Sequence, residues 1–360
     1  MRLVVSGGGT GGHLFPGLAV ARGVEQRLAS AEVLFITTAR AMDQEILRRS
    51  GLSTAVIRCS GIKGAGYPAK VRSLLRQPLA VFQALSLLRG FRAELVLGVG
   101  GYVTGPVLLA AKLLGLPTCI HEQNSVPGLA NKLAGRLADR ICTSIPCGEV
   151  FPAARTVLTG NPVREQILAL AGREREEHDP PVLLVLGGSQ GAHRVNQLVV
   201  EAVAELVQRG LRPRMIHQTG EMDHALVKEA YQGLGLEAEV QPFFTDMAAL
   251  YAAADMAISR AGATTLAELA VVGLPALLVP YPYAADDHQW FNGLHYAGSG
   301  GCLLKREEEL SGTGMADLLE PCLRDQATLE QMAASMGQQG IPEATERIVD
   351  QCVELLSRRS

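Results

Sequence analysis

The residues that could carry out chemistry gather in short glycine-rich segments. Segment 7–12 (GGGTGG) follows an apolar run and precedes a helix-like stretch, and five of its six positions are glycine. Backbone N–H groups at the start of a helix can face an anion or a sugar closely. His13 follows on the expected first helical turn, where a helix N-terminus disfavours the charged imidazole. His13 is therefore a candidate general base, and the alternative is a histidine that caps or packs locally.

The same segment fits the GxGxxG pattern, which would predict a nicotinamide-dependent oxidoreductase. That class of enzyme needs an acidic residue at the end of the second strand to bind the ribose diol. The expected second strand, 33–37, runs into Thr38, and Glu32 lies at its beginning. The missing acid argues against a dehydrogenase, so we expect no nicotinamide cofactor.

Two further polar segments follow expected strands in the first half of the chain. Segment 98–102 (GVGGY) is rich in glycine, and segment 121–124 (HEQN) places four polar residues in succession. Protein cores seldom accept such a run, so we expect it to face a ligand or the surface. Glu122, the only carboxylate of these motifs, is a second candidate base, and the alternative is an exposed loop charge.

The second half repeats this arrangement. Segment 187–192 (GGSQGA) is a glycine loop with a serine hydroxyl as an additional donor, and segment 259–268 (SRAGATTLAE) joins a strand to a helix. The helix dipole there could stabilise a diphosphate, and Glu268 could bind a ribose diol through both oxygens. The alternative role of Glu268 is to stabilise its own helix. A polar cluster at 286–289 (DDHQ) could bind sugar hydroxyls.

The sequence has none of the DxD, HxE or HExxH patterns by which carboxylates and histidines often hold a metal. We therefore expect no metal cofactor. If a nucleotide diphosphate is the leaving group, helix N-termini and arginine side chains would have to neutralise it.

The charges are unevenly distributed, although 33 Lys and Arg nearly balance 36 Asp and Glu. No acidic residue lies between Glu45 and Glu94. A field of one sign indicates an anionic partner such as phosphate, nucleic acid or a membrane surface, and the alternative is a solvated arginine-rich face. Nine basic residues stand in this span: Arg48, Arg49, Arg58, Lys63, Lys70, Arg72, Arg76, Arg89 and Arg92.

Segment 67–91 within this span is both apolar and basic, which is typical of a helix that lies on an anionic bilayer. The alternative is an ordinary crossover helix packed on a sheet. The most apolar long stretch, 103–116, is interrupted by Lys112, and no leader-like segment opens the chain, so we expect a cytoplasmic protein without a transmembrane helix. The expected membrane contacts are Leu75, Leu79, Phe82, Arg72, Arg76 and Arg89.

These motifs would be positioned by two series of short apolar strands that alternate with longer helical stretches. The first series lies at 3–6, 33–37, 54–58, 95–99, 118–121 and 140–143, and the second at 182–186, 214–218, 239–241, 256–259 and 276–280. This alternation predicts an α/β protein with two Rossmann-like, doubly wound parallel sheets that face each other across a cleft. We expect domains at 1–162 and 163–341, with a C-terminal helix at 342–360 that packs back on the first.

Seven motifs occur in one order: GGTGGH at 8–13, GVGGY at 98–102, HEQN at 121–124, GNPVR at 160–164, GGSQGA at 187–192, SRAGATTLAE at 259–268 and DDHQ at 286–289. Together they resemble the MurG family of bacterial glycosyltransferases. The resemblance implies a GT-B fold and inverting transfer of GlcNAc from UDP-GlcNAc to the MurNAc 4-hydroxyl of undecaprenyl-pyrophosphoryl-MurNAc-pentapeptide (lipid I). It also implies peripheral attachment to the anionic cytoplasmic face of the inner membrane, and no nucleic-acid partner.

The resemblance also assigns residues. His13 would act as the base or contact the acceptor, Phe244 would contact uracil through its backbone, and either Gln289 or His288 would contact the sugar. The full set of implied UDP-GlcNAc contacts is Thr10, Gly11, Gly12, Asn124, Arg164, Ser189, Phe244, Ala263, Thr264, Thr265, Leu266, Ala267, Glu268 and Gln289. The remaining alternatives are another GT-B transferase, a UDP-GlcNAc 2-epimerase and a non-catalytic nucleotide sensor at the membrane.

Overall fold

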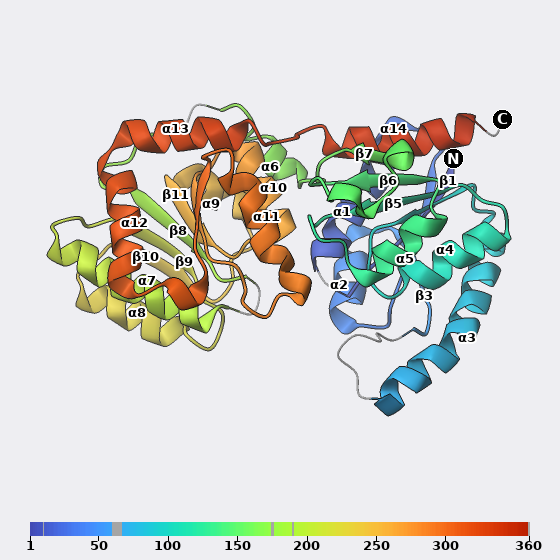
Figure 1. Cartoon of the computed structure of the whole chain (residues 1–360), viewed down its shortest axis with the longest axis horizontal. Helices are drawn as coiled ribbons and strands as arrows, with labels where there is room; N and C mark the ends of the chain where they lie inside the picture. Colours follow the sequence, from blue (N-terminus) through green and yellow to red (C-terminus); the bar gives the residue numbers. More distant parts are fainter. Residues whose placement is uncertain (10, 60–66, 174–175, 189–190, 359–360) are drawn as a thin grey trace. The chain divides into compact units, whose positions relative to one another are not determined.

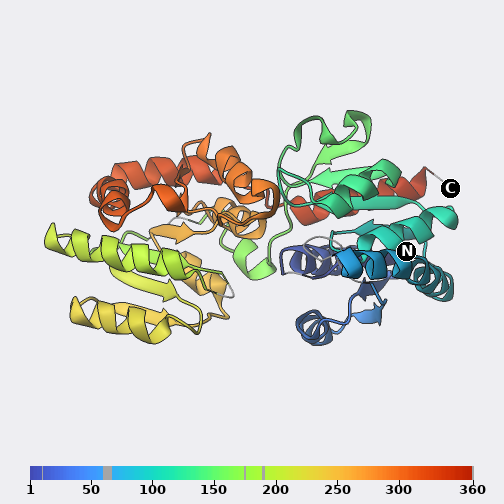
Figure 2. The same cartoon turned by 60° about the horizontal axis from the view of Figure 1, so that its bottom comes forward.

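The computed structural model describes residues 1–9, 11–59, 67–173, 176–188 and 191–358, with only the backbone for residues 42 and 67–76. The chain divides into two compact units (Figure 1). The N-terminal unit comprises Met1–Val163 and Glu343–Ser360, and the C-terminal unit comprises Arg164–Pro342. Each unit contains one parallel sheet with helices on both faces (Figure 2), so the predicted fold class is confirmed.

The sheet of the N-terminal unit has seven parallel strands in the order β3-β2-β1-β4-β5-β6-β7. Six of them match predicted strands, and the seventh was missed because it is three residues long and only partly buried. The strands are β1 (Arg2–Ser6), β2 (Glu32–Thr37), β3 (Ser53–Val56), β4 (Leu95–Gly98), β5 (Thr118–Glu122), β6 (Arg140–Thr143) and β7 (Thr156–Leu158).

The helices of this unit are α1 (Gly11–Arg27), α2 (Ala41–Ser50), α3 (Tyr67–Phe91), α4 (Thr104–Leu113), α5 (Leu129–Leu137) and α14 (Ala344–Ser357). Alternate side chains of β1 enter two separate cores, as the period of a strand requires. Leu3 and Val5 pack with α1 and α14, whereas Val4 packs with α3 and α4. Burial of both faces explains why this strand reads as a continuous apolar run.

Helix α14 belongs to the N-terminal unit although it is the last helix of the chain. Ile348, Val349 and Cys352 are buried in the same core as β1 and α1. Figure 1 shows α14 beside the sheet of the N-terminal unit. Gly23 of α1 allows this close contact, because a Cβ atom there would lie 2.6 Å from the methyl group of Thr345.

The C-terminal unit has six parallel strands in the order β10-β9-β8-β11-β12-β13. The sequence predicted five of them and missed the last, another strand of three residues. The strands are β8 (Val182–Leu186), β9 (Arg214–Gln218), β10 (Ala238–Gln241), β11 (Met256–Ser259), β12 (Ala276–Leu278) and β13 (Cys302–Leu304). The helices are α6 (Glu165–Leu168), α7 (His193–Gln208), α8 (His224–Gly233), α9 (Met247–Ala253), α10 (Ala263–Val272), α11 (His288–Ala297), α12 (Gly312–Arg324) and α13 (Gln326–Gly337).

The strand order determines where the glycine segments lie in each sheet. In each sheet the chain first runs outward in one direction and then returns to the other side of the first strand, so a switch point lies beside β1 and beside β8. Ligands of doubly wound sheets bind at the carboxyl ends of the strands at such a point. The glycine segments follow β1 and β4 in one unit and β8 and β11 in the other, and all four therefore stand at a switch point.

Candidate functional site

The two glycine loops of the N-terminal unit pack backbone against backbone. A Cβ atom on Gly101 would lie 2.3 Å from the carbonyl oxygen of Gly8, and Gly101 has a φ of +84°. A side chain at this position would both clash and force a left-handed backbone. Glycine is therefore required where the loop after β4 meets the loop after β1.

His13 lies on the first turn of α1, as predicted. Its ring rests on the second glycine loop, because a Cβ atom on Gly100 would lie 2.8 Å from its Cδ2 atom. The ring is partly exposed. The fold thus brings His13 and the loops after β1 and β4 together at one switch point, and its role as the base stays a prediction.

The HEQN segment is not at the surface, and this expectation was wrong for its first three residues. His121, Glu122 and Gln123 are buried, and Asn124 alone is partly exposed. The core accepts the run because most of its polar atoms find partners, with Gln123 Oε1 the exception among the described residues. His121 Nε2 lies 3.0 Å from the Gly160 carbonyl oxygen, and Gln123 Nε2 donates to the Val99 carbonyl oxygen at 3.0 Å. Burial lowers the pKa of His121 to about 4, so its ring is neutral at pH 7.

Glu122 is neither an exposed loop charge nor an open carboxylate. Its Oε1 accepts hydrogen bonds from the backbone N–H and the side-chain amide of Asn124 at 2.9 and 3.2 Å. Its Oε2 accepts from the backbone N–H of Gly128 at 3.2 Å and from Asn131 Nδ2 at 2.9 Å. Four bonds use the acceptor capacity of a carboxylate. This geometry favours a role in holding the loop between β5 and α5 over the predicted role as a base.

Asp43 is a buried carboxylate at the first glycine loop that the sequence reasoning missed. Its Oδ2 accepts a hydrogen bond from the Gly9 backbone N–H at 2.8 Å and another from Thr38 Oγ1 at 3.3 Å. Asp43 lies on α2, beyond the end of β2 where the search for an acid stopped. The turn between β2 and α2 brings Asp43 next to the first glycine loop. The Asp43 carboxylate holds the backbone of that loop in place.

Glu268 is buried on α10 of the C-terminal unit. Arg164 Nε donates to its Oε1 at 3.0 Å, Arg164 Nη2 lies 2.9 Å from the same oxygen, and Tyr251 Oη donates to its Oε2 at 2.9 Å. Burial raises the pKa of Glu268, and the positive charge of Arg164 opposes that shift. The sequence had singled out Glu268 and Arg164 separately. Tyr251 carries no signal in the sequence, because it lies in the short apolar helix α9.

The N-terminus of α10 can receive an anion. Its N-cap residue, Gly262, has no side chain to satisfy the first N–H groups of the helix. Ala263 and Thr264 form the first turn, and Thr264 Oγ1 is buried without a hydrogen-bond partner among the described residues. Thr265, Leu266 and Ala267 continue the same helix towards Glu268. The helix therefore presents N–H donors at one end and the carboxylate little more than a turn later.

The other implied donor contacts are distributed as follows. The Phe244 backbone N–H donates to Gln218 Oε1 at 3.1 Å, and Gln289 Oε1 accepts from the Tyr281 N–H at 2.9 Å. His288 Nδ1 lies 2.8 Å from the Ala285 carbonyl oxygen. Gly11 and Gly12 begin α1. Thr10 and Ser189 lie outside the described residues, and the sugar contact by either His288 or Gln289 stays a prediction.

Segment 67–91 forms a single helix, α3, with two different faces. Ala80, Ala84 and Leu88 are buried in the core, as in a crossover helix. Leu79 is 51% and Phe82 is 72% exposed, and Arg89 is also exposed. The side chains of Leu75, Arg72 and Arg76 lie outside the described residues. The crossover-helix interpretation therefore applies to one face, and membrane contact of the other face stays a prediction.

Two of the nine basic residues share one carboxylate within the N-terminal unit. Arg48 and Arg49 both pair with Glu45, at 2.9 and 2.8 Å. Together with Glu45 these two arginines thus contribute one net positive charge to the one-signed field expected from the sequence. No helix among the described residues is long and apolar enough to cross a bilayer.

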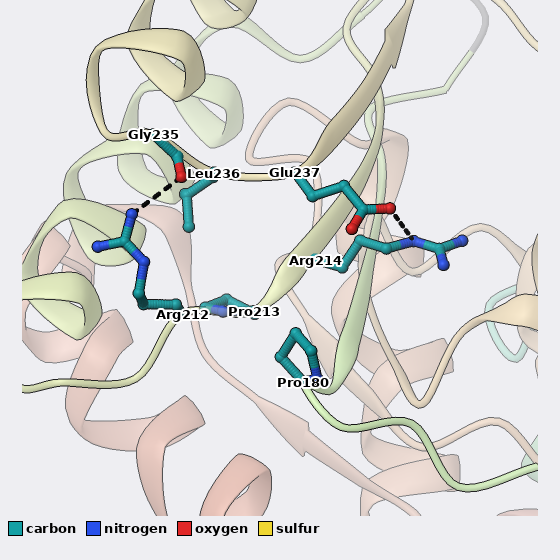
Figure 3. Close-up of a pocket in the computed structure, with 7 residues that line it drawn as sticks. All are labelled: Pro180, Arg212, Pro213, Arg214, Gly235, Leu236 and Glu237. Carbon is teal, nitrogen blue, oxygen red and sulfur yellow. Dashed lines mark hydrogen bonds and ion pairs between the residues drawn. The ribbon is translucent and has the colours of Figure 1, made fainter.

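A pocket of about 280 Å³ lies at the opposite edge of the C-terminal sheet, where the strands begin (Figure 3). Its polar groups already have partners. Arg212 Nη2 donates to the Gly235 carbonyl oxygen at 2.9 Å, and Arg214 Nε lies 3.6 Å from Glu237 Oε1. The pocket is remote from the glycine loops and is not part of the site. The described residues contain no cluster of three side chains suited to a metal.

Comparison with known proteins adds independent evidence. Residues 3–143 match the glycosyltransferase family 28 N-terminal domain, and residues 182–348 match the C-terminal domain of the same family. A UDP-N-acetylglucosamine–N-acetylmuramyl-(pentapeptide) pyrophosphoryl-undecaprenol N-acetylglucosamine transferase of Desulfotalea psychrophila is 48% identical over 359 residues, which cover 99% of this chain and 97% of that protein. A protein of Geotalea daltonii with the same name is 44% identical over 354 residues, or 98% and 97% of the two chains.

Solved structures agree with this relationship. The crystal structure of Acinetobacter baumannii MurG has a TM-score of 0.81 and 31% identity, and covers 98% of this chain and 99% of its own. A UDP-GlcNAc 2-epimerase from Neisseria meningitidis has a TM-score of 0.68 at 13% identity over 98% of this chain and 100% of its own, which shows a shared fold alone. The GT-B fold and the resemblance to the MurG family are thus confirmed: the chain belongs to glycosyltransferase family 28, as a member of its MurG family of N-acetylglucosamine transferases.

Proposed function

We propose that the protein transfers GlcNAc from UDP-GlcNAc to the MurNAc 4-hydroxyl of undecaprenyl-pyrophosphoryl-MurNAc-pentapeptide, the step from lipid I to lipid II in peptidoglycan synthesis. The observation that carries this proposal is the 48% identity to the Desulfotalea psychrophila transferase over nearly the whole of both chains. The arrangement of the motifs supports it, since every glycine segment stands at a switch point of its sheet.

The C-terminal unit supplies the groups that suit the nucleotide. The uncapped first turn of α10 offers N–H donors and a positive dipole end for the diphosphate. Glu268 is placed to accept hydrogen bonds from the ribose, and Arg164 beside it carries a positive charge that can offset charge on the departing UDP. These roles need no metal, so activity in excess EDTA should equal activity in its absence.

The N-terminal unit supplies the groups that suit the acceptor. Inversion at the anomeric carbon needs a base for the 4-hydroxyl proton on the face opposite UDP. His13 is a partly exposed imidazole that directly follows the first glycine loop and contacts the second, whereas Glu122 has its four acceptor positions filled. We assign the base to His13 for this reason.

We place the protein on the anionic cytoplasmic face of the inner membrane. Exposed leucines continue from α3 across the neighbouring helices at a spacing of four residues, which sets them on one side of each helix. They are Leu109 and Leu113 on α4, and Leu129, Leu133 and Leu137 on α5. The exposed arginines Arg89 and Arg136 lie on these helices too. Apolar side chains among arginines suit an interface with anionic lipid.

The activity is tested by incubation with UDP-GlcNAc and a short-chain lipid I analogue, followed by mass analysis of the product. We expect UDP and an acceptor heavier by one GlcNAc residue. Free ManNAc or an unchanged acceptor would contradict the transferase assignment in favour of an epimerase or a nucleotide sensor. A His13→Ala variant that keeps full turnover would remove His13 as the base.

The membrane assignment is tested with vesicles that contain anionic phospholipid. Replacing Leu79 and Phe82 by Ser should release the protein while UDP affinity stays the same. Leu226→Ser is the matched control, because Leu226 is 55% exposed on α8 of the other unit. Binding of the double variant as tight as that of the control would show that the contact surface lies elsewhere.

A further inference from the structure

The Glu268 carboxylate is covered on both oxygens. Oε1 faces two guanidinium nitrogens of Arg164 at 2.9 and 3.0 Å, and Oε2 accepts the hydroxyl of Tyr251 at 2.9 Å. The side chain of Glu268 is only 5% exposed. A ribose diol that binds a carboxylate through two hydroxyls needs access to both oxygens. Arg164 fills both acceptor positions of Oε1, whereas Tyr251 fills only one of the two positions of Oε2.

A diol that uses both oxygens therefore needs Arg164 to withdraw from Oε1. Tyr251 is 1% exposed, and it is packed into the core through α9. Burial raises its pKa well above the ordinary value, so its hydroxyl remains a hydrogen-bond donor. The Arg164 side chain is 37% exposed. The backbone of Arg164 is extended, and the residue directly precedes α6, a helix of four residues. Arg164 is thus the more exposed of the two partners, and its side chain has solvent into which it can turn.

We propose that Arg164 occupies the ribose position on Glu268 in the empty protein and leaves it when the nucleotide binds, while Tyr251 stays and orients the carboxylate. This inference rests on the proposed role of Glu268 as the ribose acceptor. A guanidinium that leaves a carboxylate needs another anion, and the diphosphate of the donor supplies one. Tyr251 is accordingly a positioning residue, and Arg164 couples recognition of the ribose to recognition of the phosphates.

This movement of Arg164 from Glu268 to the diphosphate (the exchange) predicts opposite changes in affinity for two ligands when Arg164 is removed. Uridine has the ribose but no phosphate, so it must break the Arg164–Glu268 pair without giving the guanidinium a new partner. UDP breaks the same pair and supplies that partner. Removal of the Arg164 side chain should therefore help uridine and harm UDP, whereas a purely structural arginine would affect the binding of both ligands in the same direction.

The test measures the dissociation constants of UDP and uridine for the wild type, Arg164→Ala and Arg164→Lys by calorimetry and ligand-observed NMR. For Arg164→Ala we expect UDP to bind at least ten-fold more weakly and uridine several-fold more tightly. Arg164→Lys should fall between the two proteins for both ligands. Arg214→Ala is the matched control, because that side chain is also 37% exposed but lies at the far edge of the sheet. Uridine affinity that falls or stays the same in Arg164→Ala overturns the exchange.

Two further measurements separate this inference from the assignment of Glu268. Wild-type protein should prefer UDP to its 2′-deoxy analogue, and Glu268→Gln should reduce that preference; if it does not, Glu268 is not the ribose acceptor and the assignment itself fails. Tyr251→Phe should weaken UDP and uridine by the same factor, because it disturbs the carboxylate in both complexes. A Tyr251→Phe protein that binds both ligands like the wild type would remove Tyr251 from the proposal.

Discussion

Glu122 and Glu268 are buried carboxylates, one in each unit, and burial raises the pKa of both. Glu122 accepts four hydrogen bonds from three residues close to it in sequence, two of them from backbone N–H groups. Glu268 is held by side chains from two other elements, and one of these is partly exposed. A carboxylate satisfied by its own loop stabilises that loop, whereas one satisfied by a side chain that can turn away stays available to a ligand.

The largest effect is expected for Glu122→Ala. This change removes the acceptor of the Gly128 N–H and one of the two acceptors of the Asn131 amide, which keeps only the His121 carbonyl oxygen. The free energy of unfolding of the N-terminal unit should fall by about 2–4 kcal/mol, the scale for buried donors left unsatisfied. Urea denaturation together with hydrogen exchange of β5 and α5 measures this loss. A variant as stable as the wild type would break the comparison, because Glu122 would then not be holding its loop.

Glu268→Ala should act on ligand binding instead. UDP affinity is expected to fall by about 1.5–3 kcal/mol, the range for a hydrogen bond to a charged group. The loss of stability should be smaller than for Glu122→Ala, because Arg164 is partly exposed and can turn to water. Calorimetry with UDP and urea denaturation of both variants give the two numbers. Unchanged UDP affinity would remove Glu268 from the nucleotide site.

Each unit also contains one fully buried histidine, His121 in the N-terminal unit and His217 in the C-terminal unit. The two units can therefore be compared through the pH dependence of their free energies of unfolding. Burial lowers the pKa of His121 to about 4 and that of His217 to about 3. Both values lie below the value of about 6.5 for an unfolded histidine, so below pH 6.5 the unfolded chain binds protons that the folded unit does not. The stability that each neutral ring contributes is therefore fully present above pH 6.5. It is lost as the pH falls towards 4 for His121 and towards 3 for His217. Between pH 7 and pH 5.5 we expect each histidine to lower the free energy of unfolding of its unit by about 1 kcal/mol.

Urea denaturation at the two pH values measures this fall. His217→Gln keeps a polar partner for Tyr231 and Asn196, to which His217 is bonded at 2.8 and 3.1 Å. The variant should therefore reduce the fall in the C-terminal unit and leave that of the N-terminal unit as it is. An undiminished fall in the C-terminal unit would show that other groups carry the pH dependence there.

The smallest effect is expected for Asp43→Asn. An asparagine can place its oxygen where Asp43 Oδ2 accepts from Gly9 and Thr38, so the change removes the charge but not the acceptor. We expect the free energy that stabilises the first glycine loop to fall by about 0.5–1 kcal/mol. Asp325→Asn is the control, since Asp325 accepts a backbone N–H at the start of α13, in the other unit.

The readout for Asp43→Asn is the KM of the lipid acceptor, which should rise about two- to five-fold while the Kd of UDP is unchanged. An equal rise for Asp325→Asn, or a change in UDP affinity, would show that the effect does not come from the first glycine loop.

Much of the fold followed from the sequence because both sheets are parallel and covered on both faces. Strands such as β1 and β8 are then continuous apolar runs followed by glycine, and this pattern predicts a buried strand from the sequence alone. The strands β7 and β13 were missed, since three residues at the edge of a sheet are too few to show a pattern. The HEQN segment was misplaced because burial of a polar run depends on partners such as Gly160 and Val99, far away in sequence.

The sequence by itself therefore determined the order of the motifs, the two sheets and the family, since these depend on residue types at short, regular spacing. Only the tertiary structure decided which carboxylates are already occupied. Asp43 meets Gly9, and Glu268 meets Arg164 and Tyr251, across separations of 34, 104 and 17 residues. A hydrogen bond over such a separation is set by how the intervening helices and strands pack, and no local pattern of residues records that packing.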